Sequence, residues 1–201
     1  MNMRNHLIAL ALSGLPVLSC LAAEPSFSCA GVRAGSIDEL ICQTPELAVL
    51  DQKLADVYQQ ATAKAVNEHP PTLKAEQRGW LKGRDECWKD EAKNQCVADS
   101  YRLRIAELQA RYALLPGTGP VTYECDNQPA KEVLATFYAT EPATAVVEFG
   151  DSTSLMVQQP AASGSKYQGR NESLWEHQGE ATVVWGYEAE PMKCKARPIK
   201  S

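Results

Sequence analysis

The residue pattern of the chain changes at LLPGTGPVTY, residues 114–123. Before this stretch, apolar residues recur at spacings of three and four, as on one face of a helix; after it, short runs are rich in β-branched and aromatic residues, as in strands. The glycines and prolines of residues 116–120 cannot continue a helix. We therefore predict a fold of the α+β class with two separate domains, a helical one over residues 24–115 and a β domain over residues 121–201, joined by a linker at residues 116–120.

The helical part begins with two start signals. Ser36-Ile37-Asp38-Glu39 is a capping box that predicts a short helix through Cys42. Thr44-Pro45-Glu46 combines an N-cap residue, a proline at the first helical position and an acid in the first turn, which predicts a longer helix to about Asn67. One apolar face of that helix is formed by Leu47, Leu50, Leu54, Val57 and Ala61.

Two further helices follow the sequence HPPT at residues 69–72. The first has a shared side made of Leu73, Gln77, Trp80, Leu81, Arg84 and Trp88. The second runs from about Gln95 to Leu114, with a stripe of Tyr101, Ile105, Leu108 and Tyr112. Amphipathic helices of this length can bury a small core only against one another, which predicts a small antiparallel bundle.

The N-terminus has the layout of a secretory signal peptide over residues 1–23. Arg4 gives the positive region, residues 7–21 the apolar run and Ala22-Ala23 the small-residue cleavage site. The apolar run is shorter than the roughly 20 residues of a membrane span. Val17-Leu18-Ser19-Cys20 also looks like a lipobox, so two outcomes stay open: a soluble periplasmic or secreted protein cut after Ala23, or a lipoprotein anchored to the membrane through Cys20.

Six cysteines remain after the signal peptide, and export to an oxidising compartment predicts that they form disulfides. They are Cys29, Cys42, Cys87, Cys96, Cys125 and Cys194. Cys29 with Cys42 and Cys87 with Cys96 are the favoured pairs because each closes a short loop, although four cysteines allow three pairings. Cys125 and Cys194 would then fasten the ends of the β domain. The cysteines lack zinc-site spacing and the histidines are isolated, so we expect neither a metal nor a cofactor.

The charge of the exported chain limits the class of partner. Residues 24–201 contain 19 Lys and Arg against 25 Asp and Glu, a net charge of −6. This charge argues against binding to nucleic acid and weakly favours a cationic or neutral partner.

Several ordered motifs of the helical part match a known family. They are Ser26-Phe27-Ser28-Cys29, Ile41-Cys42-Gln43-Thr44-Pro45-Glu46-Leu47, Leu50-Asp51, Gln77-Arg78-Gly79-Trp80-Leu81-Lys82-Gly83-Arg84-Asp85 and Arg104-Ile105-Ala106-Glu107-Leu108. With these motifs, residues 26–112 resemble the LprI-like family of exported helical domains, which is named for a lysozyme inhibitor. Trp80 and Arg84 are candidates for a recognition surface, but one helical turn apart they are better explained as a packed Trp with an Arg lying over it.

The β part consists of short runs bounded by Asp, Asn, Gly or Pro. The runs are residues 121–125, 132–138, 145–149, 154–157 and 181–185. They predict a succession of antiparallel strands, and about 80 residues of such a meander suit a small barrel or sandwich.

The sequence Ser163-Gly164-Ser165-Lys166 raises the question of catalysis. It fits the Ser-x-x-Lys pattern in which a lysine activates a serine nucleophile. That chemistry also needs a serine at a helix start, Ser-Asp-Asn and Lys-Thr-Gly motifs and an oxyanion hole. The sequence lacks both companion motifs, and residues 163–166 lie between predicted strands. We therefore predict that the protein is not an enzyme and has no catalytic residues.

The same residues carry a second resemblance. Tyr123-Glu124-Cys125-Asp126-Asn127, a Ser-Gly-x-x-Tyr motif at Ser163, Gly164 and Tyr167, and the stretch from Trp175 to Ala181 together resemble the MliC/PliC family of inhibitors of c-type lysozyme over residues 121–196. The resemblance implies a barrel of about eight strands with a loop that enters the lysozyme cleft. It also implies that the Ser163 hydroxyl faces the catalytic carboxylates, while Gly164 lets the loop turn.

The resemblance implies further contact residues around this loop. Tyr167 and Trp175 are expected to be either rigid anchors or barrel core, with core favoured for Trp175. Where the family has Lys-Gly, this chain has His177-Gln178. Histidine is mostly neutral at pH 7, so a charge-assisted contact requires protonation of His177 or a substitute such as Lys166. The predicted lysozyme-binding residues are Ser163, Gly164, Ser165, Lys166, Tyr167, Trp175 and His177.

Two classes of function follow. The favoured one is an exported proteinaceous inhibitor that occupies the cleft of c-type lysozyme and protects peptidoglycan, with the helical domain as a second binding module or a spacer. The alternative is a cell-envelope protein that keeps the barrel scaffold for another ligand, such as a glycan or an assembly partner, and does not inhibit lysozyme.

Overall fold

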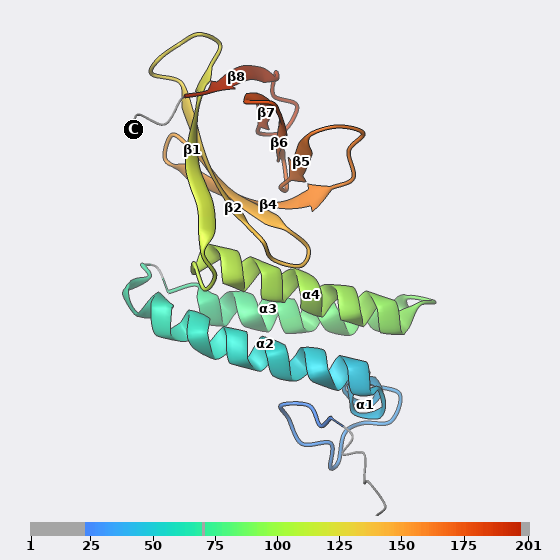
Figure 1. Cartoon of the computed structure of the whole chain (residues 1–201). Helices are drawn as coiled ribbons and strands as arrows, with labels where there is room; N and C mark the ends of the chain where they lie inside the picture. The colour runs from blue at the N-terminus through green and yellow to red at the C-terminus, as the bar shows by residue number, and fades with distance from the viewer. Residues whose placement is uncertain (1–22, 70, 198–201) are drawn as a thin grey trace, which may run out of the picture.

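The computed structural model describes residues 23–69 and 71–197. The predicted signal peptide, apart from Ala23, and the candidate lipidation residue Cys20 lie outside the described residues. Among the described helices, none combines the length and the apolar character needed to cross a membrane. The chain forms a layer of helices followed by a β-barrel, as Figure 1 shows.

The first part of the chain is helical. Its elements are α1 (Ile37–Gln43), α2 (Pro45–Lys64), the 3-10 helix η1 (Ala65–Asn67), α3 (Leu73–Asp85), the 3-10 helix η2 (Glu86–Lys89) and α4 (Lys93–Arg111). The long helices α2, α3 and α4 run in alternating directions (Figure 1), so the predicted antiparallel bundle is confirmed. The second of the predicted long helices is shorter than expected, because the chain tightens into η2 after Asp85.

The helix starts follow the signals in the sequence. The Ser36 hydroxyl accepts a hydrogen bond of 3.2 Å from the Glu39 N–H at the start of α1. The Glu39 carboxylate reaches back to the N–H of Gly35, at 2.7 Å, one residue before the capping box predicts. Pro45 occupies the first turn of α2, where a missing N–H costs nothing.

One apolar core holds the helices together. Its largest fully buried side chains include Tyr101, Ile41, Leu47 and Leu108. These come from α1, α2 and α4, and Leu73 of α3 completes the cluster. The stripes of three- and four-residue spacing therefore meet one another, as amphipathic helices require.

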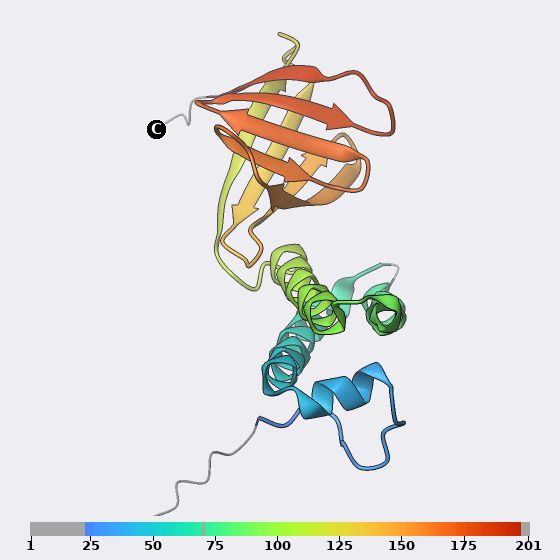
Figure 2. The same cartoon turned by 90° about the vertical axis from the view of Figure 1, so that its right-hand side faces the viewer.

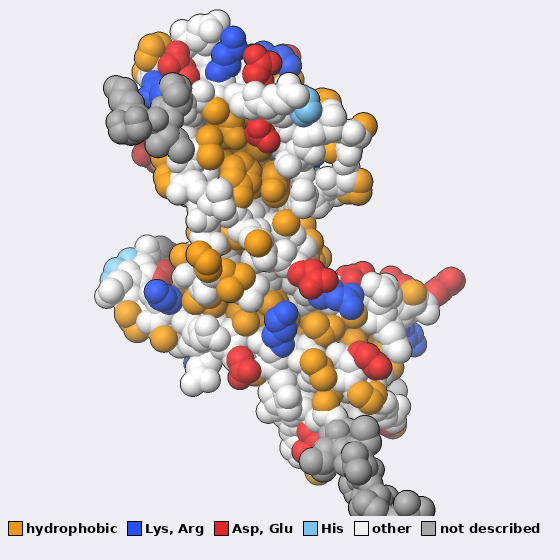
Figure 3. Space-filling model, in the orientation of Figure 1, with side chains coloured by type: hydrophobic (Ala, Val, Ile, Leu, Met, Phe, Trp, Pro, Cys, Tyr) orange, Lys and Arg blue, Asp and Glu red, His pale blue; other side chains and the backbone are white. Residues whose placement is uncertain are grey.

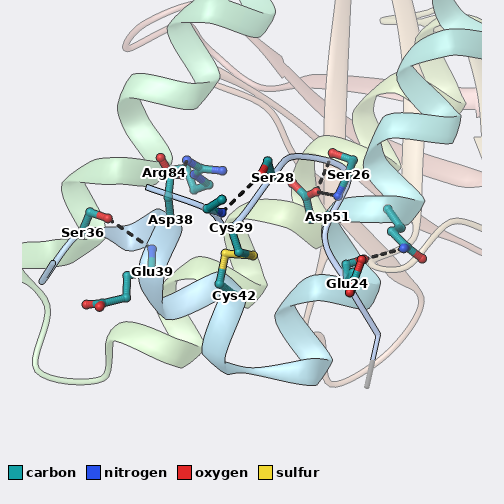
Figure 4. Close-up of a disulfide and its surroundings, with 12 residues drawn as sticks. Glu24, Ser26, Ser28, Cys29, Ser36, Asp38, Glu39, Cys42, Asp51 and Arg84 are labelled. Carbon is teal, nitrogen blue, oxygen red and sulfur yellow. Dashed lines mark hydrogen bonds and ion pairs between the residues drawn. A yellow bond between two sulfur atoms is a disulfide. The ribbon is translucent and has the colours of Figure 1, made fainter. Parts of the chain in front are cut away.

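Three disulfides stabilise the protein, two within the helical part and one within the β part. The structure pairs Cys29 with Cys42 and Cys87 with Cys96 in the helical part, and Cys125 with Cys194 in the β part. Figure 4 shows the first bond, which ties the segment before α1 to the last turn of α1. This is the pairing favoured from the sequence. Each bond stabilises the fold chiefly by restricting the unfolded chain, typically by about 2 to 4 kcal/mol.

The second part is a closed antiparallel barrel of eight strands. The strands are β1 (Gly117–Cys125), β2 (Glu132–Tyr138), β3 (Thr144–Phe149), β4 (Ser152–Gln159), β5 (Ser165–Gln168), β6 (Glu172–His177), β7 (Glu180–Trp185) and β8 (Met192–Ala196). Each strand pairs with the next one, and β1 pairs with β8 to close the barrel. The predicted fold class is confirmed.

Alternate residues of the strands fill the barrel interior. The buried set includes Tyr123, Val133, Ala135, Val147, Met156, Tyr167, Leu174, Val183 and Met192. The period of two explains why each strand reads as a short run of mixed apolar and polar residues. The closing pair Cys125 and Cys194 stand opposite each other in the ladder between β1 and β8.

The predicted linker at residues 116–120 differs from the structure. Gly117 and Thr118 already pair with Tyr138 and Phe137 of β2, and the register then shifts before Val121. Gly119 has a φ of +122°, and a Cβ there would lie 2.7 Å from the Ala135 carbonyl oxygen. Glycine allows this close backbone approach, so a stretch that cannot continue a helix still forms the start of a strand.

The helices and the barrel touch through α4. This helix contacts β3 and β4, and Figures 1 and 2 show it as the helix nearest to the barrel. Arg111 and Tyr112 face Val146, Thr153 and Leu155 across a small pocket at this junction. In the space-filling view the two parts form two lobes joined by a narrower waist (Figure 3).

Candidate functional site

The loop between β4 and β5, residues 160–164, is held tightly against β6. Gly164 has a φ of +66°, and a Cβ at this position would lie 2.1 Å from the carbonyl oxygen of Glu176 and 2.9 Å from Cβ of His177. A side chain of any size would therefore push the loop away from β6. The motif glycine is required here by close backbone packing, and it sets Ser163 beside the end of β6.

Trp175 of β6 also holds the loop. Its indole N–H donates a hydrogen bond of 3.0 Å to the carbonyl oxygen of Ser163. The side chain is 47% exposed, so the interpretation of Trp175 as barrel core is wrong. Alternation along β6 is the reason, because Leu174 takes the inward position and Trp175 faces outward.

Tyr167 lies on the opposite side of the same sheet. It is 7% exposed, and its ring packs on Phe137 with the centroids 5.3 Å apart. Burial raises the pKa of its hydroxyl, and the nearby Glu176 carboxylate adds to the effect. The structure therefore makes Tyr167 part of the barrel core, where it supports β5 from inside and is not available as a surface anchor.

The other predicted residues take different positions along β5 and β6. Ser165 is half-buried and stands opposite Glu176, while Lys166 is exposed and stands opposite Trp175. His177 is exposed at the last position of β6 and pairs with Glu180 of β7. Loop residue Ser163 is exposed, and among the described residues its hydroxyl has no hydrogen-bond partner.

The turn after His177 has an unusual backbone. Gln178 has a φ of +53° and Gly179 a φ of +82°, so both central residues of the hairpin between β6 and β7 lie in the left-handed region. Such turns match the twist of a two-residue hairpin and favour Asn-Gly or Gly-Gly. The Gly179 N–H donates to the Glu176 carboxylate at 3.1 Å, which fastens the turn.

Ser163, Trp175 and His177 line one surface groove, which we call the Ser163 groove. The remaining lining residues are Glu124, Asp126, Asn127, Glu180, Ala181, Thr182, Lys193, Cys194, Lys195, Ala196 and Arg197. The groove therefore runs from the loop across β6, β7 and β8 to β1. Lys166 is absent from this lining, so the structure does not bring it together with Ser163 and His177 in the groove.

The walls of the Ser163 groove carry both signs of charge. Asp126 accepts from Lys131 Nζ at 2.6 Å and from the Lys193 N–H at 2.9 Å. The Lys131 contact is the main reason that the pKa of Asp126 lies below its ordinary value. Arg197 donates to Glu124 at 3.3 Å and also pairs with Glu132. Most of the acidic groups near the β1 end of the groove are thus already paired.

The helical part contains a buried polar network that includes Arg84. Arg84 is 4% exposed, and its Nη1 donates to the Tyr101 hydroxyl at 2.9 Å. The same hydroxyl donates to Asp51 Oδ1 at 2.7 Å, while Arg84 Nη2 donates to Asp38 at 2.8 Å. Trp80 packs edge-on against Tyr101, 5.2 Å between centroids, with the Arg84 guanidinium 5.8 Å from the Trp80 ring. The interpretation of Trp80 and Arg84 as packing residues is confirmed.

Asp51 connects this network to the N-terminal segment. Its Oδ2 accepts from both the N–H and the hydroxyl of Ser26 at 2.6 Å, as Figure 4 shows. Burial raises the pKa of Tyr101, which keeps its hydroxyl protonated and able to donate to Asp51. Sequence reasoning missed this role of Asp51 and Tyr101. The available signal was an acidic residue within the apolar face between Leu47 and Leu54.

Within residues 23–69 and 71–197, no three His, Cys, Asp or Glu side chains gather closely enough to hold a metal ion.

Two family descriptions match the chain. Residues 29–115 match the family described as lysozyme inhibitor LprI. Residues 123–192 match the family described as membrane-bound lysozyme-inhibitor of c-type lysozyme, MliC.

Individual proteins are similar to the chain as well. A lipoprotein named LprI in Mycobacterium tuberculosis (strain H37Rv) and in Mycobacterium bovis is 28% identical over 177 residues, which cover 83% of this chain and 88% of the relative. A crystal structure of Pseudomonas aeruginosa MliC in complex with hen egg white lysozyme shares 29% sequence identity, with a TM-score of 0.33; the match covers 41% of this chain and 90% of the MliC chain.

Proposed function

The chain joins an LprI domain to an MliC domain, and from this pairing we propose that it is an exported inhibitor of c-type lysozyme that protects peptidoglycan. Both families are described as lysozyme inhibitors, in agreement with the prediction that the chain is not an enzyme. The partner is c-type lysozyme, and the proposed mechanism is entry of the loop at residues 160–164 into the active-site cleft.

The position of Ser163 is the observation that carries this mechanism. The residue is exposed at the edge of the Ser163 groove, with its hydroxyl free among the described residues. A retaining glycosidase places a protonated acid and an ionised carboxylate about 5 Å apart. A serine hydroxyl both donates and accepts hydrogen bonds, so it can bind to either of these groups.

The main chain around Ser163 is already fixed in the free protein. Trp175 binds its carbonyl oxygen, and Gly164 packs on the backbone of β6. A loop that is ordered before binding loses less conformational entropy on complex formation. We therefore propose that Ser163 contributes directly to the affinity for lysozyme, whereas Gly164 and Trp175 keep the loop rigid. Tyr167 supports β5 from the core.

The function is tested with the full exported chain in its disulfide-bonded form. We expect it to slow the clearing of a bacterial cell-wall suspension by hen egg white lysozyme. Ser163→Ala should weaken binding about 5- to 30-fold, the loss of one or two hydrogen bonds of which at least one is to a charged group. Ser152→Ala is the matched control, because Ser152 is exposed at the start of β4 beside the helical part and should leave binding unchanged.

A result without inhibition separates the two classes of function. If the wild-type chain neither binds lysozyme nor slows clearing, the inhibitor proposal fails and the alternative, an envelope protein with another ligand, takes its place. If the wild-type chain inhibits and Ser163→Ala inhibits equally well, the loop mechanism fails while the inhibitor function stands.

His177 gives the proposed contact a pH dependence. The side chain is exposed in the Ser163 groove, close to Glu180 and to the loop at Gly164. Protonation of the imidazole adds a positive charge that would face the ionised carboxylate of lysozyme. We expect binding to strengthen between pH 7.5 and pH 6, and His177→Gln should remove this dependence. Binding with the same pH profile in both proteins would exclude a role for His177.

We propose the cell envelope as the location. The relatives carry names that describe a lipoprotein and a membrane-bound inhibitor. For this chain two mature forms follow from the sequence: one that is lipidated at Cys20, and one that is cut after Ala23 and begins with Glu24. Mass spectrometry of the mature N-terminus distinguishes them, and Cys20→Ser should release the protein from membranes only in the first case.

A further inference from the structure

Three basic side chains line the Ser163 groove, and two of them have close partners. Arg197 donates to Glu124 at 3.3 Å and to the Pro129 carbonyl oxygen at 3.1 Å, and it also pairs with Glu132. Lys193 Nζ donates to the Thr182 hydroxyl at 3.1 Å. The guanidinium of Arg197 is therefore engaged with the barrel.

Lys195 is the third basic side chain, and it is held loosely. Its side chain is 73% exposed, and its Nζ lies 3.9 Å from Glu180 Oε1, beyond hydrogen-bond length. The Glu180 side chain is 74% exposed as well. An exposed pair at this distance contributes little, so Lys195 can leave Glu180 at small cost.

The sheet register places Lys195 two strands away from His177, on the same face of the sheet. His177 stands opposite Glu180 on β7, and Glu180 stands opposite Lys195 on β8. With neighbouring strands about 4.8 Å apart, the backbone of Lys195 lies roughly 10 Å from that of His177. The four-carbon stem of lysine can carry the ammonium group over much of this distance toward the loop.

Lys166 does not line the Ser163 groove, although it is exposed on β5 opposite Trp175. The sequence alone suggested Lys166 as the cation that assists Ser163, but the lining of the Ser163 groove includes Lys195, 29 positions further along the chain, and not Lys166.

We propose that Lys195 pairs with the ionised catalytic carboxylate of c-type lysozyme while Ser163 binds the neighbouring acid. This inference rests on the proposed function and names the cation of the same site. An ammonium group is a donor whose contact with a carboxylate is charge-assisted. Lys195 thus determines affinity for enzymes that display an ionised carboxylate in the cleft.

The test compares two lysines of the full chain. Lys195→Met and Lys166→Met each remove one positive charge from an exposed strand position, so their effects on long-range steering are matched. We expect Lys195→Met to raise the dissociation constant for hen egg white lysozyme about 10- to 100-fold and Lys166→Met to change it less than about twofold. Lys195→Arg, which keeps the charge, should recover most of the affinity.

Two further measurements separate a direct contact from indirect effects. Against a lysozyme whose ionised catalytic aspartate is changed to asparagine, Lys195→Met should cause no further loss. In the background of Glu180→Gln, Lys195→Met should still weaken binding, since otherwise Lys195 acts only by neutralising Glu180.

The outcomes are distinct. Equal effects of the two methionine variants, or an undiminished effect of Lys195→Met on the asparagine lysozyme, would overturn the role of Lys195 while inhibition by the wild-type chain still stands. A wild-type chain that does not bind lysozyme would overturn both the proposed function and this inference.

Discussion

The indole N–H of Trp175 lies 3.0 Å from the carbonyl oxygen of Ser163, so a side chain of β6 fixes the main chain of the loop that precedes β5. Trp175→Phe keeps an aromatic ring and removes the donor. One hydrogen bond contributes about 1 kcal/mol, which predicts roughly fivefold weaker lysozyme binding. Amide exchange at residues 163–165 should become faster while global stability changes little. Unchanged exchange together with unchanged affinity would show that the bond does not order the loop.

Alanine substitutions at Gly164 and Gly150 distinguish the energetic cost of steric overlap from the cost of a left-handed backbone. Both have positive φ, +66° and +57°, but only Gly164 has close neighbours where a Cβ would stand. Gly150→Ala should lower the free energy of unfolding by about 1 to 2 kcal/mol, the cost of the left-handed conformation. Gly164→Ala should cost about 1 to 3 kcal/mol more because of overpacking. Chemical unfolding of both variants checks this, and equal losses would contradict the tight packing of the loop on β6.

Gln178 is a position at which the barrel can be made more stable. Its φ of +53° suits asparagine better than glutamine, and Gln178→Asn creates the preferred Asn-Gly pair. We expect a gain of about 0.5 kcal/mol in the free energy of unfolding. Gln158→Asn makes the same chemical change within β4, where asparagine is disfavoured, and should not stabilise. A gain at both positions, or at neither, would argue against the turn geometry as the cause.

Tyr101 is the centre of the buried network in the helical part. Tyr101→Phe removes the hydroxyl that accepts from Arg84 and donates to Asp51. Leaving buried polar groups without a partner should reduce the free energy of unfolding by about 1 to 3 kcal/mol. Tyr187→Phe is the control, since Tyr187 is 78% exposed, and it should be neutral. Faster amide exchange at Ser26 would show that Asp51 has also loosened its hold on the N-terminal segment.

The Glu68 carboxylate makes the stability of the start of α3 depend on pH. Its carboxylate accepts from the N–H groups of Leu73 and Thr72 and from the Tyr112 hydroxyl. The Leu73 bond is the main reason that the pKa of Glu68 lies below its ordinary value of 4.5. A lowered pKa stabilises the fold above about pH 4.5, and this contribution disappears as the pH falls through the folded-state pKa.

Glu68→Gln should therefore destabilise the protein at pH 7 and become neutral at low pH. The expected difference at pH 7 is on the order of 1 kcal/mol, typical of a capping side chain. Glu141→Gln, at an exposed position between β2 and β3, should show no such change with pH. Urea unfolding of the variants between pH 3 and pH 7 measures both effects; a constant difference for Glu68→Gln would rule out the titration.

Local chemistry explains which parts of the fold the sequence predicts well. Ser36 and Pro45 mark the helix starts because caps and first-turn prolines act within a few residues. The closed barrel follows from strand alternation together with the resemblance of residues 121–196. The disulfide pairs in the helical part are local too, separated by 13 and 9 positions.

The orientation of the two aromatic residues at the site was harder to predict. Tyr167 faces the core and Trp175 faces the loop, the reverse of the favoured interpretation of Trp175 as core. Both are large residues in short strands flanked by polar positions, so composition does not reveal which face they occupy. A shift of the register by one residue would exchange the faces, and only the full sheet fixes it.

Long-range relationships were beyond a single sequence. Asp51 and Tyr101 are 50 positions apart, and His177 and Lys195 meet in one groove only through the pairing of β6, β7 and β8. The linker prediction failed for a related reason. Helix α4 already ends at Arg111, before the two glycines, and Gly117 is drawn into β1 by pairing with Tyr138 of β2, a strand that follows it in the chain.

The bond between Cys125 and Cys194 makes the barrel a covalent ring as well as a hydrogen-bonded one. An exposed loop that enters the active site of an enzyme, as proposed for residues 160–164, is also open to attack by proteases. A cut anywhere within residues 160–164 would separate β1–β4 from β5–β8 along the chain, yet Cys125 and Cys194 lie on opposite sides of the cut. The disulfide would keep the two halves joined, so cleavage within residues 160–164 would release neither fragment.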